Sequence, residues 1–273
     1  MKLLKFCGKS SFFLAFLFLI GFLTSFTVVA PHATSTIGGL VELPLPPIII
    51  NQKPQEVDRS REMAAFEAKN DDCVGWLYIP GTDIDDEIVQ AKDNDFYLRR
   101  TSMGYYYSEH GCYFVDYRNH MSGELDRNTI IYGHNIWDDG EKFSQLLAYE
   151  DWDHFSSYPY LYLQTESGMH VYRVVAAYYT FTDFYYIRPD ASDKIWSYIL
   201  RESLLRSEHL TDLDLPADGK YLTLSTCCYR YTDAYGNRRK DQRFVVLGME
   251  IDSENPPRYQ LPEKNPSPKP PAA

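Results

Sequence analysis

The sequence has 273 residues, of which 44% are hydrophobic and 15% aromatic, so it can form one packed domain with appendages and is neither disordered nor collagen-like. Its formal net charge of -11, from 27 Lys and Arg against 38 Asp and Glu, provides no basic footprint for nucleic acid and argues against that class of partner. The 5 cysteines form no C-x-x-C pair, which argues against a zinc site or a dense disulfide framework but leaves room for one nucleophilic thiol.

The N-terminus has the pattern of a membrane anchor. Three lysines precede an uncharged apolar run at residues 10–30, which is long enough to cross a bilayer as a helix. A cleavable signal peptide is the alternative, but its apolar region is usually shorter, and Pro31 spoils the most obvious cleavage site. Because the lysines precede the run, the positive-inside rule places the N-terminus in the cytoplasm. We therefore expect residues 1–30 to be a cytoplasmic stub and a single transmembrane helix in the cell membrane, with the following domain extracellular.

Proline-rich segments flank the expected domain. Residues 31–54 are rich in Pro, Gly and Thr and lack an amphipathic period, as expected of a tether. Residues 253–273 form a similar Pro-rich C-terminal tail. We exclude both segments from the fold, which leaves residues 55–252 as the folded domain.

The domain is predicted to be mostly β with accessory helices. Good helix formers at 55–70 predict a first helix, and apolar residues on one face predict two more at 141–150 and 192–206. Short β-rich runs bounded by Gly, Pro, Asp and Asn predict about eight strands, which suggests a barrel or a sandwich. These runs lie at 76–79, 87–90, 112–117, 129–133, 160–164, 170–179, 220–226 and 243–251.

Three side chains with useful chemistry lie at the ends of predicted strands. Cys227 ends a strand, where a thiol can project into a cleft and needs only a nearby cation or base to become a thiolate nucleophile. His134 follows another strand, and an imidazole can accept or deliver a proton at neutral pH. Arg243 opens a third strand, where a fixed guanidinium can hold an oxyanion or a substrate backbone.

Each of these residues also has an ordinary structural explanation. A free Cys is usually a small buried hydrophobe, and most Arg side chains are solvated, so none of the three indicates a function by itself. Cys228 should point to the opposite face of its strand because side chains alternate with a period of two. The remaining histidines lie in tether, loop or exposed-looking stretches, and we expect them to be solvated.

In combination, three strings around these residues resemble the sortase family of cysteine transpeptidases: YGHN at 132–135, TLSTC at 223–227 and RFVV at 243–246. Further strings resemble class B sortases in particular: GWLYIPGTDI at 75–84, IVQAKDNDFYL at 88–98, FVDYRN at 114–119 and the helical insert at 190–206. The resemblance covers nearly all of the chain from Gln55 to Ile251. It implies an eight-stranded sortase-type β-barrel with an N-terminal helical extension and an accessory helix before the Cys strand.

The resemblance also implies an activity at Gram-positive cell surfaces. Such an enzyme cleaves the C-terminal sorting signal of a surface protein after Thr and passes the acyl group, through a thioester on Cys227, to an amine of peptidoglycan or lipid II. His134 would protonate the departing amine, and Arg243 would steady the oxyanion and the substrate backbone. The cluster of carboxylates that forms the calcium site of class A members is not evident, so neither a metal nor a cofactor is expected. By the same resemblance the groove for the signal would be lined by Asn94, Leu98, Tyr132, Thr182, Tyr186, Ile187 and Ser225.

Two departures from the class B pattern mean that the resemblance does not predict the detailed shape of the pocket on the leaving-group side. Cys228 stands where an acidic residue is common, and the loop between Cys227 and Arg243 is longer than the family leads us to expect.

Three other functions remain as alternatives. They are a pilus-polymerising sortase whose acceptor is a pilin Lys, a catalytically silent surface-binding module suggested by the 23 tyrosines, and a secreted cysteine protease that uses water as the acceptor.

Overall fold

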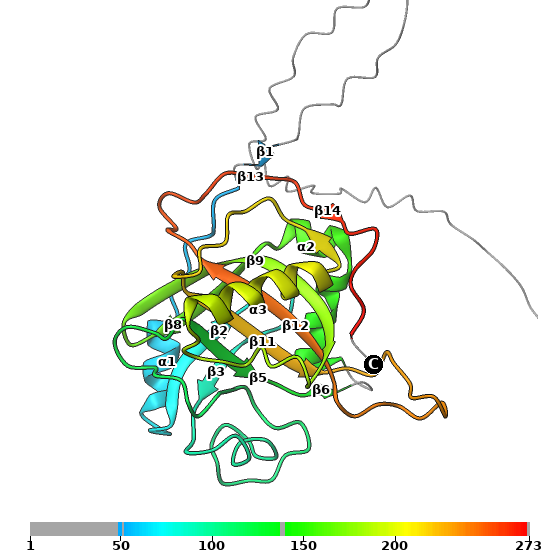
Figure 1. Ribbon diagram of the computed structural model, residues 1–273. Coiled ribbons are helices and arrows are strands. Elements are labelled where there is room, and N and C mark those ends of the chain that lie inside the picture. Colours follow the sequence, from blue (N-terminus) through cyan, green and yellow to red (C-terminus); the bar gives the residue numbers. More distant parts are fainter. Residues whose placement is uncertain (1–48, 51, 137–139, 272–273) are drawn as a thin grey trace, which may run out of the picture. The chain divides into compact units, whose positions relative to one another are not determined.

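The computed structural model describes residues 49–271 except 51 and 137–139 (Figure 1). The predicted membrane anchor at 10–30 and most of the predicted tether therefore lie outside the described residues. In the part that is described, no helix is both long enough and apolar enough to cross a membrane.

A closed barrel of eight strands forms the body of the fold, in the order β11-β12-β9-β8-β2-β3-β4-β5. Neighbouring strands are antiparallel except for the β3/β4 and β5/β11 pairs, which are parallel. The predicted strands are confirmed, although the run at 112–117 shortens to two residues. The strands are β2 Cys73–Tyr78, β3 Asp85–Val89, β4 Phe114–Val115, β5 Asn128–Tyr132, β8 Tyr160–Thr165, β9 Gly168–Phe181, β11 Tyr221–Cys227 and β12 Gln242–Glu250.

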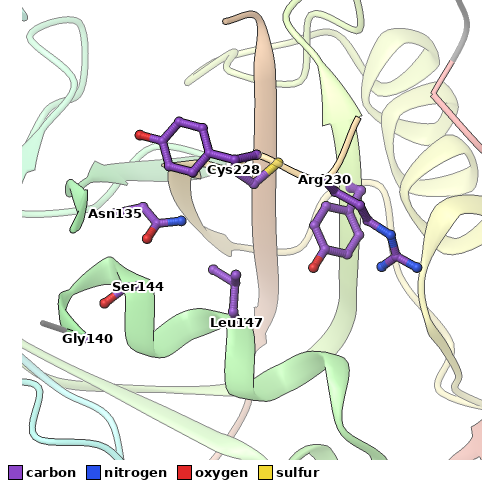
Figure 2. A pocket seen from close by; sticks show the side chains of 8 residues that line it. Asn135, Gly140, Ser144, Leu147, Cys228 and Arg230 are labelled. Carbon is purple, nitrogen blue, oxygen red and sulfur yellow. The ribbon is translucent and has the colours of Figure 1, made fainter. Parts of the chain in front are cut away.

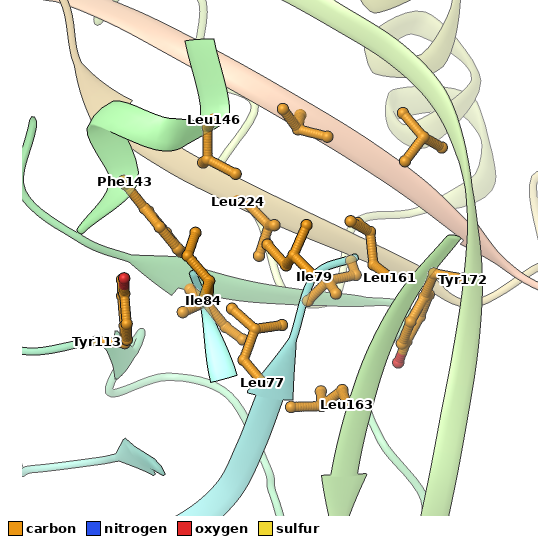
Figure 3. Packing of buried hydrophobic residues seen from close by; sticks show 14 of the residues in the cluster. Leu77, Ile79, Ile84, Tyr113, Phe143, Leu146, Leu161, Leu163, Tyr172 and Leu224 are labelled. Carbon is orange, nitrogen blue, oxygen red and sulfur yellow. The ribbon is translucent and has the colours of Figure 1, made fainter. Parts of the chain in front are cut away.

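Side-chain alternation divides β11 between two apolar clusters. Leu222 and Leu224 point into the barrel, where Figure 3 shows Leu224 among Leu77, Ile79 and other buried side chains. Tyr221 lies on the other face, in a cluster that helix α3, Asp193–Arg206, forms against the outside of the barrel. Burial on both faces explains why the strands appear in the sequence as nearly continuous apolar runs.

The predicted helices are confirmed at two of the three places. Helix α1, Ser60–Glu67, is shorter than the predicted segment at 55–70, and α3 begins directly after Ser192. The α-helix predicted at 141–150 is wrong. Its first residues form strand β7, Glu141–Lys142, which pairs with β6, Asn135–Ile136, and the rest is the 3₁₀ helix η1, Phe143–Glu150.

The backbone and the pattern of burial explain this correction. Lys142 has a φ of 55°, outside the helical range, so no α-helix can run through it. Phe143, Leu146 and Tyr149 are buried, a spacing of three that fits the three residues per turn of a 3₁₀ helix. A further short helix that the sequence did not predict, α2 Trp152–Ser157, follows.

The expectation that the C-terminal tail lies outside the fold is wrong. Strand β13, Tyr259–Gln260, pairs with β1, Ile49–Ile50, and strand β14, Glu263–Lys264, pairs with β10, His209–Leu210. The Tyr259 side chain is buried, and its ring lies 3.9 Å from the guanidinium of Arg173. An extended, Pro-rich segment can therefore attach to the domain by backbone pairing and single side chains, without an amphipathic period.

His209 also departs from the expectation that the remaining histidines are solvated. Its side chain is fully buried in β10, with Nε2 3.0 Å from the carbonyl oxygen of Tyr149 and the ring 4.5 Å from the ring of Phe155. His154 is half-buried, and burial lowers its pKa and that of His209 below the usual value. His154 and His209 are therefore packed within the domain and are not surface histidines in solvent.

Candidate active site

Cys227 and Arg243 face each other on adjacent strands. The antiparallel register of β11 and β12 pairs them directly, and directly opposed residues have Cβ atoms about 4.5–5.5 Å apart. Both side chains are partly exposed, whereas their neighbours Thr226 and Phe244 are buried. The Arg243 guanidinium donates through Nη1 to the carbonyl oxygens of Gln242 at 2.8 Å and Lys240 at 3.3 Å. The register therefore puts a fixed cation beside the thiol.

Backbone contacts bring His134 to the same end of the barrel. The parallel pairing of β5 with β11 ends at Tyr132 and Ser225, two residues before His134 and Cys227 respectively. Beyond that pair, the Thr226 hydroxyl donates to the Gly133 carbonyl oxygen at 2.7 Å. The Asn135 side-chain amide donates to the carbonyl oxygen of Cys227 at 2.8 Å. His134 is thus held between two residues that bind the chain at Cys227.

The electrostatic surroundings suit proton transfer by His134. Burial lowers the pKa of its imidazole, and the nearby Arg99 and His110 lower it further. At neutral pH the ring is therefore mostly neutral and can accept the proton of a thiol. Burial raises the pKa of the Cys228 thiol to about 12, so Cys228 stays protonated and is a poor nucleophile. Within the described part of the chain, no group of three His, Cys, Asp or Glu side chains could hold a metal ion.

Two of the predicted groove residues lie beside the thiol. Ser225 lies two residues before Cys227 and shares its face of the strand, and its hydroxyl is 2.7 Å from the buried hydroxyl of Tyr186.

Three further predicted groove residues differ in burial. Ile187 is partly buried against the α3 cluster. Leu98 is 38% exposed, which argues against ordinary core packing for that residue. Thr182 is exposed directly after β9, and its backbone N–H donates to the carbonyl oxygen of Asp241 at 2.9 Å.

The other predicted groove residues converge on a carboxylate that was not singled out from the sequence. The Tyr132 hydroxyl and the Asn94 amide donate to Asp116 at 2.8 Å and 3.1 Å. Arg118 binds the same carboxylate at 2.7 Å and donates to the carbonyl oxygen of Ile187 at 3.0 Å. Burial raises the pKa of Asp116, but the hydrogen bonds from Arg118, Tyr132 and Asn94 outweigh this and lower it overall. Asp116 and Arg118 thereby join three predicted groove residues, Asn94, Tyr132 and Ile187.

A cavity of about 370 Å³ opens beside Cys228, the residue after the candidate nucleophile (Figure 2). In Figure 2, Ser144 and Leu147 of η1 approach it from one side, and Cys228 and Arg230 from the other. The cavity is lined by the residue after His134 and by the three residues after Cys227. Its lining consists of Asn135, Gly140, Ser144, Leu147, Tyr179, Cys228, Tyr229 and Arg230.

Gly133 allows His134 to occupy its position. A Cβ atom on Gly133 would lie 2.7 Å from the ring of Phe143 and 2.8 Å from the ring of Tyr113. Because both rings are buried, Gly133→Ala must displace either the rings or the backbone before His134. We expect it to lower the free energy of unfolding by about 1–3 kcal/mol and to lower kcat at least about tenfold. Urea unfolding and peptide-cleavage assays would measure the two effects, and unchanged kcat would contradict this role for Gly133.

Comparisons with known proteins identify similar chains. A model of the Sortase domain family matches residues 77–251, a span that contains His134, Cys227 and Arg243. Sortase B of Listeria monocytogenes is 39% identical over 174 residues, which is 61% of this chain and 67% of that protein. The solved Staphylococcus aureus sortase B–substrate complex is 28% identical, with a TM-score of 0.61 over 70% of this chain and 85% of that chain. A structure of sortase B complexed with triglycine is 29% identical, with a TM-score of 0.62 over 71% of this chain and 87% of the other.

Proposed function

The chain belongs to the class B sortases, a family of cysteine transpeptidases, and from this premise we propose that it cleaves a C-terminal sorting signal after Thr and transfers the acyl group to an amine of peptidoglycan or lipid II. The observation that carries the proposal is the direct pairing of Cys227 with Arg243 on adjacent strands, with His134 held beside Cys227. Thiol, general base and oxyanion donor are the groups that acyl transfer requires.

In the first half of the reaction, neutral His134 accepts the thiol proton of Cys227. The thiolate attacks the carbonyl carbon of the signal's Thr, and Arg243 donates hydrogen bonds to the oxygen that becomes negative. The C–N bond then breaks as the imidazolium of His134 gives its proton to the departing amine. A thioester between the signal and Cys227 remains.

In the second half, an incoming amine attacks the thioester carbonyl and gives a proton to His134. The tetrahedral intermediate again places its negative oxygen at Arg243. Its collapse forms the new amide and releases the Cys227 thiolate, which recovers its proton from His134. Each group therefore returns to its starting state.

Two places near Cys227 suit two different ligands. The face that Ser225 and Tyr186 share with Cys227 suits the part of the signal before the scissile bond. The cavity lined by Asn135 and Tyr229 suits the departing segment and then the incoming amine. The substrate and triglycine complexes of related sortase B proteins support a peptide substrate and an amine acceptor for this chain as well.

Mass spectrometry of the products from a small library of sorting-signal peptides tests this proposal. With an added amine such as triglycine, we expect a transfer product joined at the carboxyl group of Thr, and without it slow hydrolysis. Hydrolysis that does not change when the amine is added would favour a cysteine protease. Transfer only to a Lys side chain of a pilin-like protein would favour a pilus-polymerising enzyme, and no reaction would favour a silent binding module.

We further propose that the enzyme works from the membrane, with its catalytic domain outside the cell. The uncharged run at 10–30 and the lysines before it support this orientation. We expect the full-length protein to sediment with membranes and to keep its N-terminus. Recovery from the medium of protein that begins near Pro31 would contradict the anchor and support a cleaved signal peptide.

A further inference from the structure

Arg230 joins the chain after the nucleophile to two residues on other elements. It follows Cys227 by three residues, and its Nη1 lies 2.5 Å from a carboxylate oxygen of Glu150. Its guanidinium lies over the ring of Tyr179, 4.5 Å from the centroid. The Tyr179 hydroxyl donates to the other oxygen of Glu150 at 2.8 Å. The three side chains form a closed group, and two of them, Tyr179 and Arg230, line the cavity next to Cys228; Figure 2 labels Arg230 and Cys228 there.

This group connects the two segments that carry the candidate thiol and base. Glu150 is the last residue of η1, and the backbone N–H of the first, Phe143, donates to the carbonyl oxygen of His134 at 2.8 Å. Arg230 therefore ties the segment after Cys227 to η1, the helix whose first residue is hydrogen-bonded to His134. The separation between thiol and imidazole depends on both segments keeping their places.

The C-terminal segment 265–271, which we call the strap, lines a hollow together with two members of this group, Tyr179 and Arg230. The backbone N–H groups of Asn265 and Lys269 donate to the carbonyl oxygens of Glu208 and Leu205, both at 2.8 Å. The Lys269 ammonium donates to Glu202 at 2.6 Å. In Figure 1 the strap descends from β14 toward the loop between β11 and β12. A hollow of about 170 Å³ separates the two and is lined by Tyr179, Arg206, Glu208, Arg230, Tyr231, Pro268, Lys269, Pro270 and Pro271.

We propose that Arg230 is a positioning residue for acyl transfer and that the strap holds Arg230 in place. Arg230 acts through the backbone of residues 227–229 and through Glu150, and it does not touch the reacting atoms. Its side chain and that of Glu150 are 43% and 42% exposed, so their ion pair contributes little to global stability. Removing this ion pair therefore affects the arrangement of the active-site residues more than the folding of the domain. The activity part of the test rests on the proposed transferase function.

Substitutions of Arg230 test the positioning role. Arg230→Met keeps the aliphatic stem but loses the charge and every donor, and we expect kcat to fall about 10- to 100-fold with KM for the sorting peptide within about twofold. Arg230→Lys can still pair with Glu150 and should recover part of the loss. Arg59→Met is the matched control, because Arg59 also pairs with a carboxylate, Asp85 at 2.8 Å, and lies over a tyrosine ring, Tyr78 at 5.1 Å.

Truncation after Pro266 tests the strap. It removes Lys269 and the prolines at the hollow but keeps Tyr259, β14 and Asn265, which attach the tail to the domain. We expect kcat to fall several-fold and amide hydrogen exchange of residues 228–231 to speed up. Combined with Arg230→Met, the truncation should add little, because both changes are expected to act through the position of Arg230.

Two readouts keep this inference separate from the proposed function. The rate at which iodoacetamide alkylates Cys227, located by peptide mapping, needs no substrate and should fall in Arg230→Met and in the truncated protein. If the wild type transfers no peptide, the proposed function fails, while alkylation and hydrogen exchange still test the strap. A kcat for Arg230→Met equal to that of Arg59→Met, a change confined to KM, or unchanged exchange after truncation would overturn the inference.

Discussion

Cys227→Ala should abolish both peptide cleavage and amine transfer, whereas Cys228→Ala should keep most of the activity. The two thiols are adjacent in sequence but have different surroundings. Cys227 is partly exposed opposite Arg243, and Cys228 belongs to the buried cluster inside the barrel. Loss of the nucleophile should lower kcat by at least about 10⁴-fold, because no thioester can form.

Cys228→Ala tests the alternative that Cys228, directly after Cys227, is the nucleophile. Its thiol has a pKa raised to about 12 by burial, so it holds its proton at neutral pH. The substitution removes one buried sulfur and should lower the free energy of unfolding by about 1 kcal/mol. Steady-state kinetics on the best peptide, with mass spectrometry for a thioester intermediate, measure both variants. If Cys228→Ala were inactive and Cys227→Ala active, the nucleophile would be Cys228.

The barrel was predictable from the sequence because strands that are buried on both faces appear as apolar runs. Strand β9 is buried from Val171 to Phe181, on one face by the barrel interior and on the other by α3, which gives a long apolar run. The 3₁₀ helix that begins at Phe143 was harder to predict, because the adjacent Leu146 and Leu147 also fit one face of an α-helix. Only Leu146 is fully buried, and the 3₁₀ spacing becomes visible once Tyr149 is counted with it.

The features that the sequence could not predict depend on single contacts between distant segments. Asp116 and Arg118 have a short spacing that suggests an ion pair, but their contacts with Asn94, Tyr132 and Ile187 depend on the closed barrel. The strap has no hydrophobic period at all. Its attachment rests on two backbone hydrogen bonds and on isolated side chains, which leave no pattern in a Pro-rich segment.

The three candidate catalytic residues are a different case. Cys227, His134 and Arg243 each lie at the end of a strand, and strand ends are visible in the sequence as changes from apolar to polar residues. The resemblance to sortases then grouped them. The register of β5, β11 and β12 gives this grouping a physical basis, because two parallel strand ends and the start of an antiparallel strand meet at one end of the barrel.

Arg243→Lys should fail to rescue Arg243→Ala. One nitrogen of the Arg243 guanidinium donates to two backbone carbonyl oxygens, and the planar group has further donors that can face the thiol on the neighbouring strand. A Lys ammonium is a compact charge on a flexible stem and cannot keep the same orientation while it binds the substrate. Loss of one donor to an oxyanion costs about 10² to 10³ in rate, so both variants should lose at least that much kcat.

Folding should survive in both variants, because Arg243 is only partly buried and the residues that pack β12 are Phe244 and Val245. Circular dichroism and thermal unfolding would verify this. Arg201→Lys is the matched control, since its side chain is 66% exposed on α3 and its ion pair with Glu202 is long, at 3.6 Å. That control should keep wild-type kcat. If Arg243→Lys came within about threefold of the wild type, Arg243 would supply only a nearby positive charge, and the geometric role argued from its register with Cys227 would have to be withdrawn.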